Sequence, residues 1–259
     1  MQHKFKKQFG QNFISDANLL KAIVSDAKVE KTDQVLEIGA GEGALTKYLS
    51  AAAQKVVSYE IDLSLESCLL GLGLENVKFV FKDALKEPMD KIEEDFDGDY
   101  KIVANLPYYI TTPLIFKFLS QSKRVKSMTI MVQKEVAQRI VAKPGGKDYG
   151  VLSLMCQFYS TPKITRIVGK QMFFPQPKVD SALVCLEINK QQKADSEEFY
   201  NFVKKCFSMR RKTLINNLQG YSGLSKSELA AKLPEFDLNL RPEQFSLEQY
   251  LLMLKKIGH

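Results

Sequence analysis

The sequence predicts an α/β fold, in which a parallel sheet is covered by helices on both faces, followed by a small domain made of helices. In the first half of the chain, short apolar segments typical of strands alternate with segments whose apolar residues recur at helical spacing. This alternation favours a parallel sheet, because neighbouring parallel strands are joined by a crossover that usually contains a helix. After a polar run at 189–198, helical spacing continues to the end.

The elements are expected in the following order. A basic arm with interleaved aromatic residues covers residues 1–14, and Asp16 is placed to cap the helix after it. The alternation continues through strands at 35–38, 56–59, 77–81, 101–104 and 129–132 and helical segments at 44–53, 63–70, 113–119 and 135–141. Residues 152–187 resemble a strand-rich stretch with an irregular break at 173–177. Helices are expected at 199–218, 225–233 and 247–257.

The length of 259 residues allows one sizeable core and a smaller second unit. We therefore expect a first domain at 1–188, which includes the arm, and a helical domain at 189–259.

The charge distribution favours a polyanionic partner. The net charge is +7, although residues 87–99 hold seven acids and one lysine, so the rest of the chain carries a larger basic excess. Nucleic acid is the partner that this excess suggests, and a basic protein without such a role is the alternative. The candidate RNA-binding residues lie in the arm and in the expected helix 199–218, and they are Lys4, Lys6, Lys7, Lys204, Lys205, Arg210, Arg211 and Lys212.

The cysteines and the apolar runs indicate a reducing, cytoplasmic setting. The four cysteines are far apart and form no C-x-x-C pair, which favours buried thiols over disulfides or metal ligands. No apolar run approaches the length of a membrane span, and the basic N-terminus lacks the apolar stretch of a signal peptide. We expect neither a metal nor a membrane partner.

A glycine-rich loop follows the first expected strand. Gly39 and Gly41 lie in the run EIGAGEGA, where glycines let the backbone approach a bound nucleotide closely. Glu60 ends the next strand, which is where an acid binds ribose hydroxyls in such folds. A nicotinamide cofactor, S-adenosylmethionine and a tight turn without a ligand all fit the loop alone.

Three features favour S-adenosylmethionine. Glu37 precedes the first glycine and is placed to face or orient the cationic amino-acid end of the cofactor. Gly43 adds a third glycine, and Asp83 follows the third strand, where it is placed to accept from an adenine amino group. The only histidines are His3 and His259, which removes the residue that hydride transfer often uses as an acid or base.

The tetrad Asn105-Leu106-Pro107-Tyr108 suits the binding of a planar amine. An exocyclic amino group needs two acceptors, which the Asn105 side-chain oxygen and a neighbouring backbone carbonyl can supply, and Tyr108 offers a ring for stacking. Accepting both hydrogens of adenine N6 would aim the nitrogen lone pair at a methyl donor without a strong base. The alternative is a strand end followed by Asn-x-Pro turn chemistry.

Taken together, these motifs resemble the ribosomal RNA adenine dimethyltransferases, over nearly the whole chain. The resemblance rests on FGQNF at 9–13, the glycine loop within 35–46, the tetrad, QKEVAQR at 133–139 and FPQPKVDS at 174–181. Three stretches are similar to the small-subunit branch: GQNF at 10–13, KDYGVLS at 147–153 and RRKTLINNL at 210–218.

The resemblance implies a Rossmann-like, S-adenosylmethionine-dependent catalytic domain and a helical domain that recognises RNA. It implies a cofactor pocket lined by Asn12, Ile14, Gly39, Glu60, Asp83 and Asn105. It also implies that the Leu106 carbonyl meets the target amine while Tyr108 and Phe173 or Phe174 sandwich the base, with Phe173 the preferred candidate. Tyr109 and Thr111 depart from residues common in the family.

The implied reaction is dimethylation of N6 of two adjacent adenosines near the 3′ end of 16S RNA, in a nearly assembled small subunit. A monomer is the default expectation. A large-subunit methylase that confers macrolide resistance is the nearest alternative. An RNA-binding assembly factor with incidental methylation and a nicotinamide oxidoreductase are two others.

Overall fold

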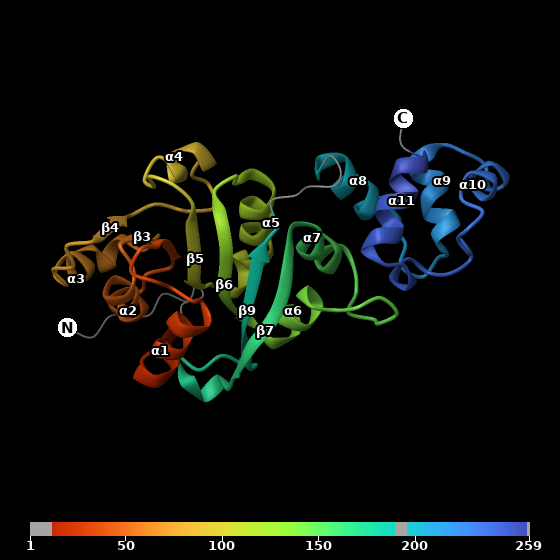
Figure 1. Ribbon diagram of the computed structural model, residues 1–259. Coiled ribbons are helices and arrows are strands. Elements are labelled where there is room, and N and C mark those ends of the chain that lie inside the picture. The colour runs from red at the N-terminus through yellow and green to blue at the C-terminus, as the bar shows by residue number, and fades with distance from the viewer. Residues whose placement is uncertain (1–11, 190–195, 258–259) are drawn as a thin grey trace. The chain divides into compact units, whose positions relative to one another are not determined.

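Seven strands form one sheet in the computed structural model of the chain, which describes residues 12–189 and 196–257 (Figure 1). Their spatial order is β4-β3-β2-β5-β6-β9-β7. The strands are β2 (Gln34–Ile38), β3 (Lys55–Tyr59), β4 (Val77–Val80), β5 (Tyr100–Asn105), β6 (Val125–Gln133), β7 (Ser160–Val168) and β9 (Ser181–Ile188). A separate pair joins β1 (Phe13–Ile14) to β8 (Phe173–Phe174).

The strands from β4 to β6 are parallel, as the sequence predicts, whereas β9 runs antiparallel to β6. The interior residues of β2 and β5 show why this part is buried on both faces. Val35 and Val103 belong to one apolar cluster, and their neighbours Leu36 and Ile102 are equally inaccessible although alternation points them to the opposite face. Continuous β-branched and apolar runs are typical of such doubly covered strands.

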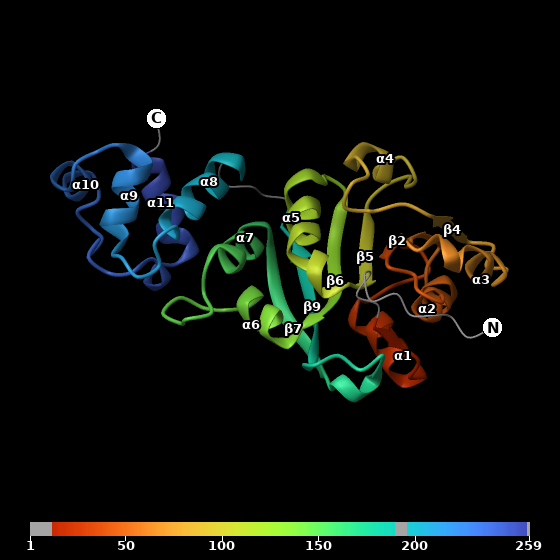
Figure 2. The same ribbon diagram turned by 180° about the vertical axis from the view of Figure 1, so that it is seen from behind.

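Helices cover the two faces. α1 (Ala17–Asp26) and α2 (Ala44–Ala52) place their buried leucines in the cluster that contains Val35 and Val103. α5 (Thr111–Gln121) lies on the opposite face, as the view from behind shows (Figure 2). The shorter helices α3 (Glu66–Leu70) and α4 (Met89–Glu93) follow β3 and β4, and α6 (Lys134–Ile140) follows β6. As predicted, Asp16 caps α1, because its carboxylate accepts from the Leu19 amide at 2.7 Å.

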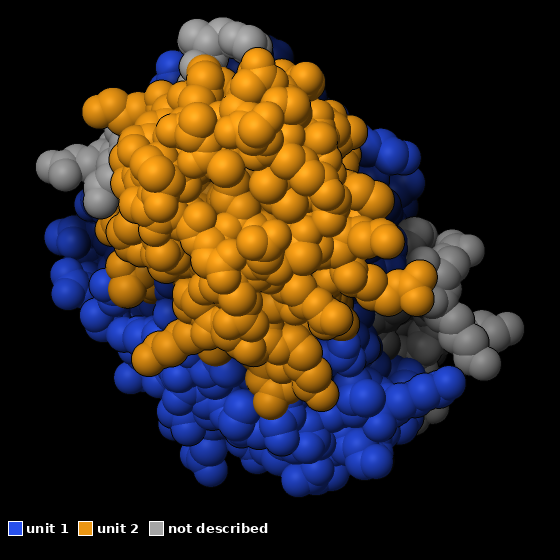
Figure 3. Space-filling model, turned by 90° about the vertical axis from the view of Figure 1, so that its right-hand side faces the viewer, with its two compact units in different colours: residues 1–137, 162–188 blue, residues 138–161, 189–259 orange. Residues whose placement is uncertain are grey.

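The described chain divides into two compact units (Figure 3). Of the described residues, the first contains 12–137 and 162–188, and the second contains 138–161, 189 and 196–257. One of these boundaries coincides with the expected one at 188. The sequence does not indicate the inclusion of 138–161 in the second unit.

The segment 152–159 is helical, which corrects the expectation of a strand-rich stretch there. Residues Val151–Tyr159 form α7, and most of its side chains are buried. An apolar run of this length fits a buried strand and a buried helix equally well. Phe158 shows how α7 belongs to the second unit, because its ring stacks on Phe199 with centroids 4.6 Å apart.

The second unit is otherwise made of four helices, α8 (Ser196–Cys206), α9 (Leu214–Ser222), α10 (Lys226–Lys232) and α11 (Leu247–Ile257). Its core is aromatic: the Tyr250 ring meets those of Phe202 and Phe207 at about 6 Å, and its hydroxyl donates to the Pro242 carbonyl at 2.7 Å. The hydroxyl is the only polar atom of the tyrosine side chain, and this hydrogen bond satisfies it in the core.

The expected helix 199–218 is wrong in one respect, because it is interrupted between α8 and α9. The buried side chain of Asn217 holds the interrupting turn 207–213. Its oxygen accepts from the Met209 amide at 3.0 Å, and its nitrogen donates to the Thr213 carbonyl at 3.2 Å. Side-chain bonds of this kind compete with helical backbone bonds, which periodicity alone does not show.

Two further expectations concern cysteines and membrane spans. Cys156, Cys185 and Cys206 are buried free thiols, and Cys68 is an exposed one. Within 12–189 and 196–257, no helix combines the length and apolar character that crossing a membrane requires.

Candidate active site

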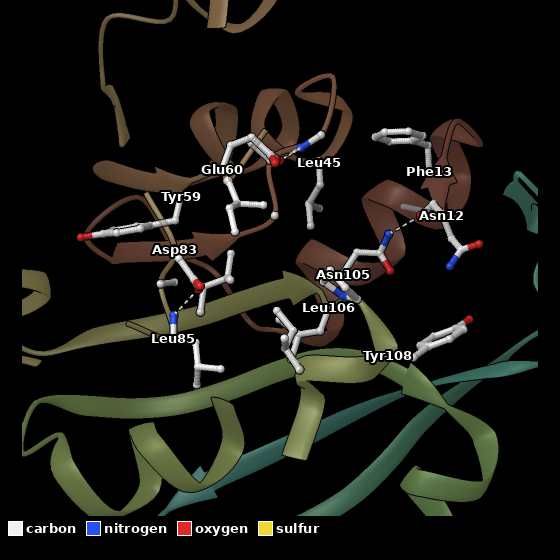
Figure 4. A pocket seen from close by; sticks show the side chains of 18 of the residues that line it. Asn12, Phe13, Leu45, Tyr59, Glu60, Asp83, Leu85, Asn105, Leu106 and Tyr108 are labelled. Atoms are coloured by element: carbon white, nitrogen blue, oxygen red, sulfur yellow. Dashed lines mark hydrogen bonds between the residues drawn. The ribbon is translucent and has the colours of Figure 1, made fainter. Parts of the chain in front are cut away.

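A pocket of about 520 Å³ opens at the carboxyl ends of β2, β3, β4 and β5 in the first unit (Figure 4). Because these strands are parallel, the loops that follow them meet at one edge of the sheet. Ten of the predicted site residues line this pocket: Asn12, Ile14, Gly39, Gly41, Glu60, Asp83, Asn105, Leu106, Pro107 and Tyr108. Segments from residue 12 to residue 108 are thus brought together around one space.

The glycine loop has a backbone conformation that other residues resist. Gly39, Gly41 and Gly43 have φ angles of 84°, 57° and 79°, in the left-handed region. At Gly41 a side chain is also excluded by space, because a Cβ there would lie 2.6 Å from the Phe13 ring. The backbone therefore runs directly along the wall of the pocket.

Glu60 joins the loops that follow β2 and β3. One carboxylate oxygen accepts from the Gly41 amide and the other from the Asp62 amide, both at 2.8 Å. The side chain is buried, and this burial raises the pKa of the Glu60 carboxyl, while the backbone donors oppose the shift. The two amide donors fix the orientation of the carboxylate on the pocket wall.

Asp83 begins the loop after β4. One carboxylate oxygen accepts from the Leu85 amide at 2.9 Å, and the Lys86 ammonium lies 3.8 Å from the other. A quarter of the side chain remains exposed. The carboxylate therefore has a fixed direction and can still accept from a ligand.

Asn105 ends β5, and its amide is oriented by one hydrogen bond. The side-chain nitrogen donates to the Asn12 carbonyl at 2.8 Å, which turns the amide oxygen toward the pocket (Figure 4). The same bond ties the described start of the chain to the sheet. An oriented acceptor is therefore present at the position that the sequence predicts.

The rest of the tetrad forms one tight turn. The Pro107 carbonyl accepts from the Ile110 amide at 3.2 Å, which closes the short helix η3 (Tyr108–Ile110). The Tyr108 hydroxyl lies 2.8 Å from Ser181 Oγ at the start of β9. Burial raises the pKa of the Tyr108 phenol, so this group stays neutral near pH 7. The Tyr108 ring is thus fixed at one end by the backbone turn and at the other by the contact of its hydroxyl with Ser181.

Glu37 does not line the pocket, in contrast to the expectation that it would face a bound cofactor. Its carboxyl is completely buried beneath the glycine loop, where the Thr46 and Ser58 hydroxyls both donate to one oxygen at 2.6 Å. The other oxygen has no partner among the described residues. Burial raises the pKa of Glu37 to about 7. Its contacts connect β2 with α2 and β3, so its action on a ligand is indirect.

Phe173 and Phe174 differ sharply in exposure. Phe173 is 4% exposed and packs in the core cluster with Ile14, and neither Phe173 nor Phe174 lines the pocket. Phe174 is 66% exposed and pairs with Phe13, which does line it. The preferred role of Phe173 as a stacking ring therefore stays a prediction, and the structure places that ring in a core.

The predicted basic residues lie in three places. Lys204 and Lys205 are exposed on α8, while Arg210, Arg211 and Lys212 are exposed on the turn 207–213 and not on a helix. The Arg210 guanidinium donates to the Lys147 carbonyl at 2.6 Å. Lys4, Lys6 and Lys7 lie outside the described residues.

Several lining residues are absent from the sequence-based set. Ile61 and Ala84 directly follow the acids at the ends of β3 and β4, so their positions beside those acids were an available signal. Phe13 was expected only as part of the arm, and its contact with Gly41 depends on tertiary structure. Tyr109 lines the pocket and is 58% exposed.

Comparison with known proteins decides the family. The model of the ribosomal RNA adenine dimethylase family matches residues 2–257. The chain belongs to this family. It is therefore a methyltransferase that uses S-adenosylmethionine, and ribosomal RNA is its substrate.

Relatives named ribosomal RNA small subunit methyltransferase A are similar over almost their full lengths. The one from Alkaliphilus oremlandii is 45% identical, with 99% of this chain and 93% of the relative covered. The one from Clostridioides difficile is 40% identical, with 96% and 90% covered.

Two solved structures are also similar. A dimethyladenosine transferase from Plasmodium falciparum has a TM-score of 0.79 at 28% identity, with 94% of this chain and 96% of that one covered. The 23S rRNA methyltransferase ErmE has a TM-score of 0.72 at 26% identity, with 96% and 100% covered. The predicted Rossmann-like fold and family are confirmed.

The buried Glu37 predicts a pH dependence of stability. An unfolded glutamate ionises near pH 4.5, whereas the folded pKa is about 7, so the folded state binds more protons between these values. The contribution of Glu37 to stability is therefore fully present below pH 4.5 and is lost as the pH rises to 7, by roughly 3 kcal/mol. Denaturant unfolding of Glu37→Gln should lack this component, so that its stability relative to the wild type increases from pH 5 to pH 8. A constant difference would contradict the assignment.

The two phenylalanines predict different responses to truncation. Phe173→Ala removes a buried ring and should lower the free energy of unfolding by about 3–5 kcal/mol. Phe174→Ala should change it by no more than about 0.5 kcal/mol, because the ring is exposed. Thermal or denaturant unfolding checks both values. Methyl transfer is then measured for Phe174→Ala and for Phe173→Leu, which removes the ring but keeps a large apolar side chain. The stacking ring is the one whose loss slows transfer in a folded protein.

Proposed function

We propose that this enzyme places two methyl groups on N6 of each of two adjacent adenosines near the 3′ end of small-subunit ribosomal RNA, as a step in ribosome biogenesis. The observation that carries the proposal is the oriented amide oxygen of Asn105, which faces the same pocket as the carboxylates of Glu60 and Asp83. The relatives at 40–45% identity favour the small subunit. Likeness to the 23S enzyme, at 26%, supports the large-subunit alternative less well.

The polar groups of the pocket match the hydrogen-bonding groups of S-adenosylmethionine. Glu60 offers a fixed carboxylate to the ribose hydroxyls, and Asp83 offers one to the adenine amino group. Gly39 and Gly41 line the pocket and have no side chain of their own, so the backbone of the loop can approach a ligand closely. Asn12 and Ile14 line the opposite side with Asn105. Glu37 does not contact the cofactor in this proposal, and it stabilises the glycine loop from the core.

The tetrad orients the target amine. When bound, S-adenosylmethionine would supply the methyl group and would leave as S-adenosylhomocysteine, while the proton lost from N6 would pass to water. Asn105 Oδ1 and the Leu106 carbonyl accept the two hydrogens of adenine N6, which favours a tetrahedral nitrogen whose lone pair points away from the acceptors. Pro107 fixes the turn, and Tyr108 lies against one face of the base, with Phe173 or Phe174 against the other. No side chain of the tetrad acts as a strong base.

The second transfer uses the same acceptors with one hydrogen fewer. A monomethylated amine donates only one hydrogen, so one acceptor is left to water or to a C–H contact. The Asn105 side-chain nitrogen donates to Asn12, so the amide oxygen keeps its direction during both transfers. The pocket must therefore hold the product of the first transfer less tightly.

The basic residues of the second unit supply the RNA surface of this proposal. Lys204, Lys205, Arg210, Arg211 and Lys212 are exposed, and Asn217 fixes the turn that carries the last three. Lysine and arginine on such a surface contact phosphates and present structured RNA without reading its sequence. Lys4, Lys6 and Lys7 are proposed as further RNA-binding residues. In this proposal the domain 189–259 recognises a partly or nearly assembled small subunit. The proposed enzyme is a monomer that acts in the cytoplasm.

Asn105→Ala should lower kcat/KM for methyl transfer by about 100-fold or more, because it removes one positioned acceptor from the reacting amine. RNA binding should be unchanged. Asn76→Ala is a matched control, since Asn76 also donates to backbone carbonyls but lies away from the pocket. Transfer of labelled methyl groups to small subunits measures the rate. Unimpaired transfer by Asn105→Ala would refute the mechanism.

The substrate is identified by mapping the label. Small subunits and, in a separate reaction, large subunits from cells that lack the activity are incubated with the enzyme and labelled cofactor, and the modified adenosines are located. Two adjacent labelled adenosines near the 3′ end are expected. Label only in large-subunit RNA would establish the macrolide-resistance alternative, and binding without label would establish the assembly-factor alternative.

Replacing Arg210, Arg211 and Lys212 together with glutamine should make RNA binding less dependent on salt. Each lost phosphate contact reduces the slope of log K against log salt by about 0.7–0.9, so a change of about 2 is expected. The control replaces three exposed lysines of the same unit, Lys226, Lys232 and Lys255, and should leave the slope unchanged. Equal slopes for the wild type and the first variant would remove the turn from the RNA surface.

A further inference from the structure

Lys117 is a buried lysine of α5 whose ammonium is wholly engaged by one loop. The residue as a whole is 9% exposed. Nζ donates to the carbonyls of Ala84 at 2.8 Å and Leu85 at 3.1 Å, and also to the carbonyl of Glu87. Three carbonyl acceptors require three N–H donors, which only the protonated amine has. All three N–H donors of the Lys117 ammonium are therefore used by carbonyls of residues 84–87.

This loop is also closed from its other side by Asp83. The Asp83 carboxylate accepts from the Leu85 amide, and the Asp83 carbonyl accepts from the amides of Lys86 and Glu87, both at 3.0 Å. The amides of the loop thus turn toward Asp83, and its carbonyls turn toward Lys117. Residues 82–86 line the pocket, so the direction of the Asp83 carboxylate depends on a turn that the ammonium completes.

α5 connects this loop to the tetrad. The helix begins at Thr111, directly after the short helix η3 that carries Tyr108, and Lys117 lies two turns further along it. The same rigid element therefore starts at the base-binding side of the pocket and reaches the loop that holds Asp83. Without the ammonium, the carbonyls of residues 84, 85 and 87 would lose their partner in a largely buried place, which favours rearrangement of the loop.

We propose that Lys117 is a positioning residue for cofactor recognition: it holds the loop 84–87 so that the Asp83 carboxylate meets the amino group of the cofactor's adenine. This inference rests on the proposed contact between Asp83 and that amino group. It assigns Lys117 no contact with the cofactor, the RNA or the reacting atoms. Its effect is on which purine the pocket accepts.

The test measures a ratio of affinities rather than activity. Calorimetric titration compares S-adenosylhomocysteine with S-inosylhomocysteine, in which a carbonyl oxygen replaces the adenine amino group. The wild type should prefer the adenosyl compound by about 10-fold or more, since the inosyl compound presents a carbonyl oxygen to the Asp83 carboxylate in place of the N6–H donor. In Lys117→Met, affinity for the adenosyl compound should fall by about 10-fold, and the preference should fall to about 3-fold or less.

Lys101→Met is the matched control. Lys101 is a second largely buried lysine of the same unit, 16% exposed in its side chain, which contacts Asp33 at 2.7 Å and the Lys28 carbonyl. It lies at the opposite end of β5 and does not line the pocket. Its replacement should lower stability and leave the adenosyl preference at the wild-type value. A general loss of stability is thereby separated from an effect on Asp83.

The outcomes distinguish this inference from the proposed function. If the wild type has no preference, the contact between Asp83 and the amino group is wrong, and the role of Lys117 falls with it. If Asp83→Ala loses the preference while Lys117→Met keeps it, only the role of Lys117 is refuted. Should Lys117→Met not fold, Lys117→Arg takes its place: a preference reduced by about 3-fold or more supports the role, and an unchanged one overturns it.

Discussion

The parallel pairing of β4, β3, β2 and β5 is the constraint on which the rest of the site depends. In-register pairing places Ile38 beside Tyr59 and Tyr59 beside Val80, so these strands end at one edge of the sheet. The glycine loop, Glu60, Asp83 and Asn105 each follow or end one strand, and no local feature of any loop could bring them together. Each face of these strands packs against different helices, so a slip by one residue is disfavoured because it would exchange the side chains of the two faces.

Hydrogen bonds between loops convert this proximity into a defined pocket. Glu60 accepts from an amide of the preceding glycine loop, and Asn105 donates to a carbonyl of residue 12. Lys117 donates hydrogen bonds to carbonyls of the loop after β4. Each bond joins segments that are 19 to 93 residues apart in the chain. Loops held in this way lose little freedom when a ligand arrives, which is the advantage of a preorganised site.

The sequence predicts the residues that obey local rules and misses those that depend on packing. The glycine loop, the acids at strand ends and the tetrad follow known spacings, and they meet as expected. Glu37 shares the loop's sequence signature, yet strand alternation directs its side chain into the core. The helix 151–159 is not predicted, because an apolar run has no single period. The interruption at 207–213 is not predicted either, because it depends on side-chain hydrogen bonds that one buried residue, Asn217, makes to the turn.

The choice of an amide at residue 105 follows from the two tasks that this side chain performs. Its nitrogen must donate to the Asn12 carbonyl, and its oxygen must accept from whatever occupies the pocket. An aspartate has the same shape, but an ionised carboxylate would oppose the Asn12 oxygen and add a charge to a pocket that already contains Glu60 and Asp83. A serine is too short to span both partners. Only an amide of this length supplies a donor and an acceptor in opposite directions, so the bond that anchors the N-terminal segment is also the one that aims the acceptor.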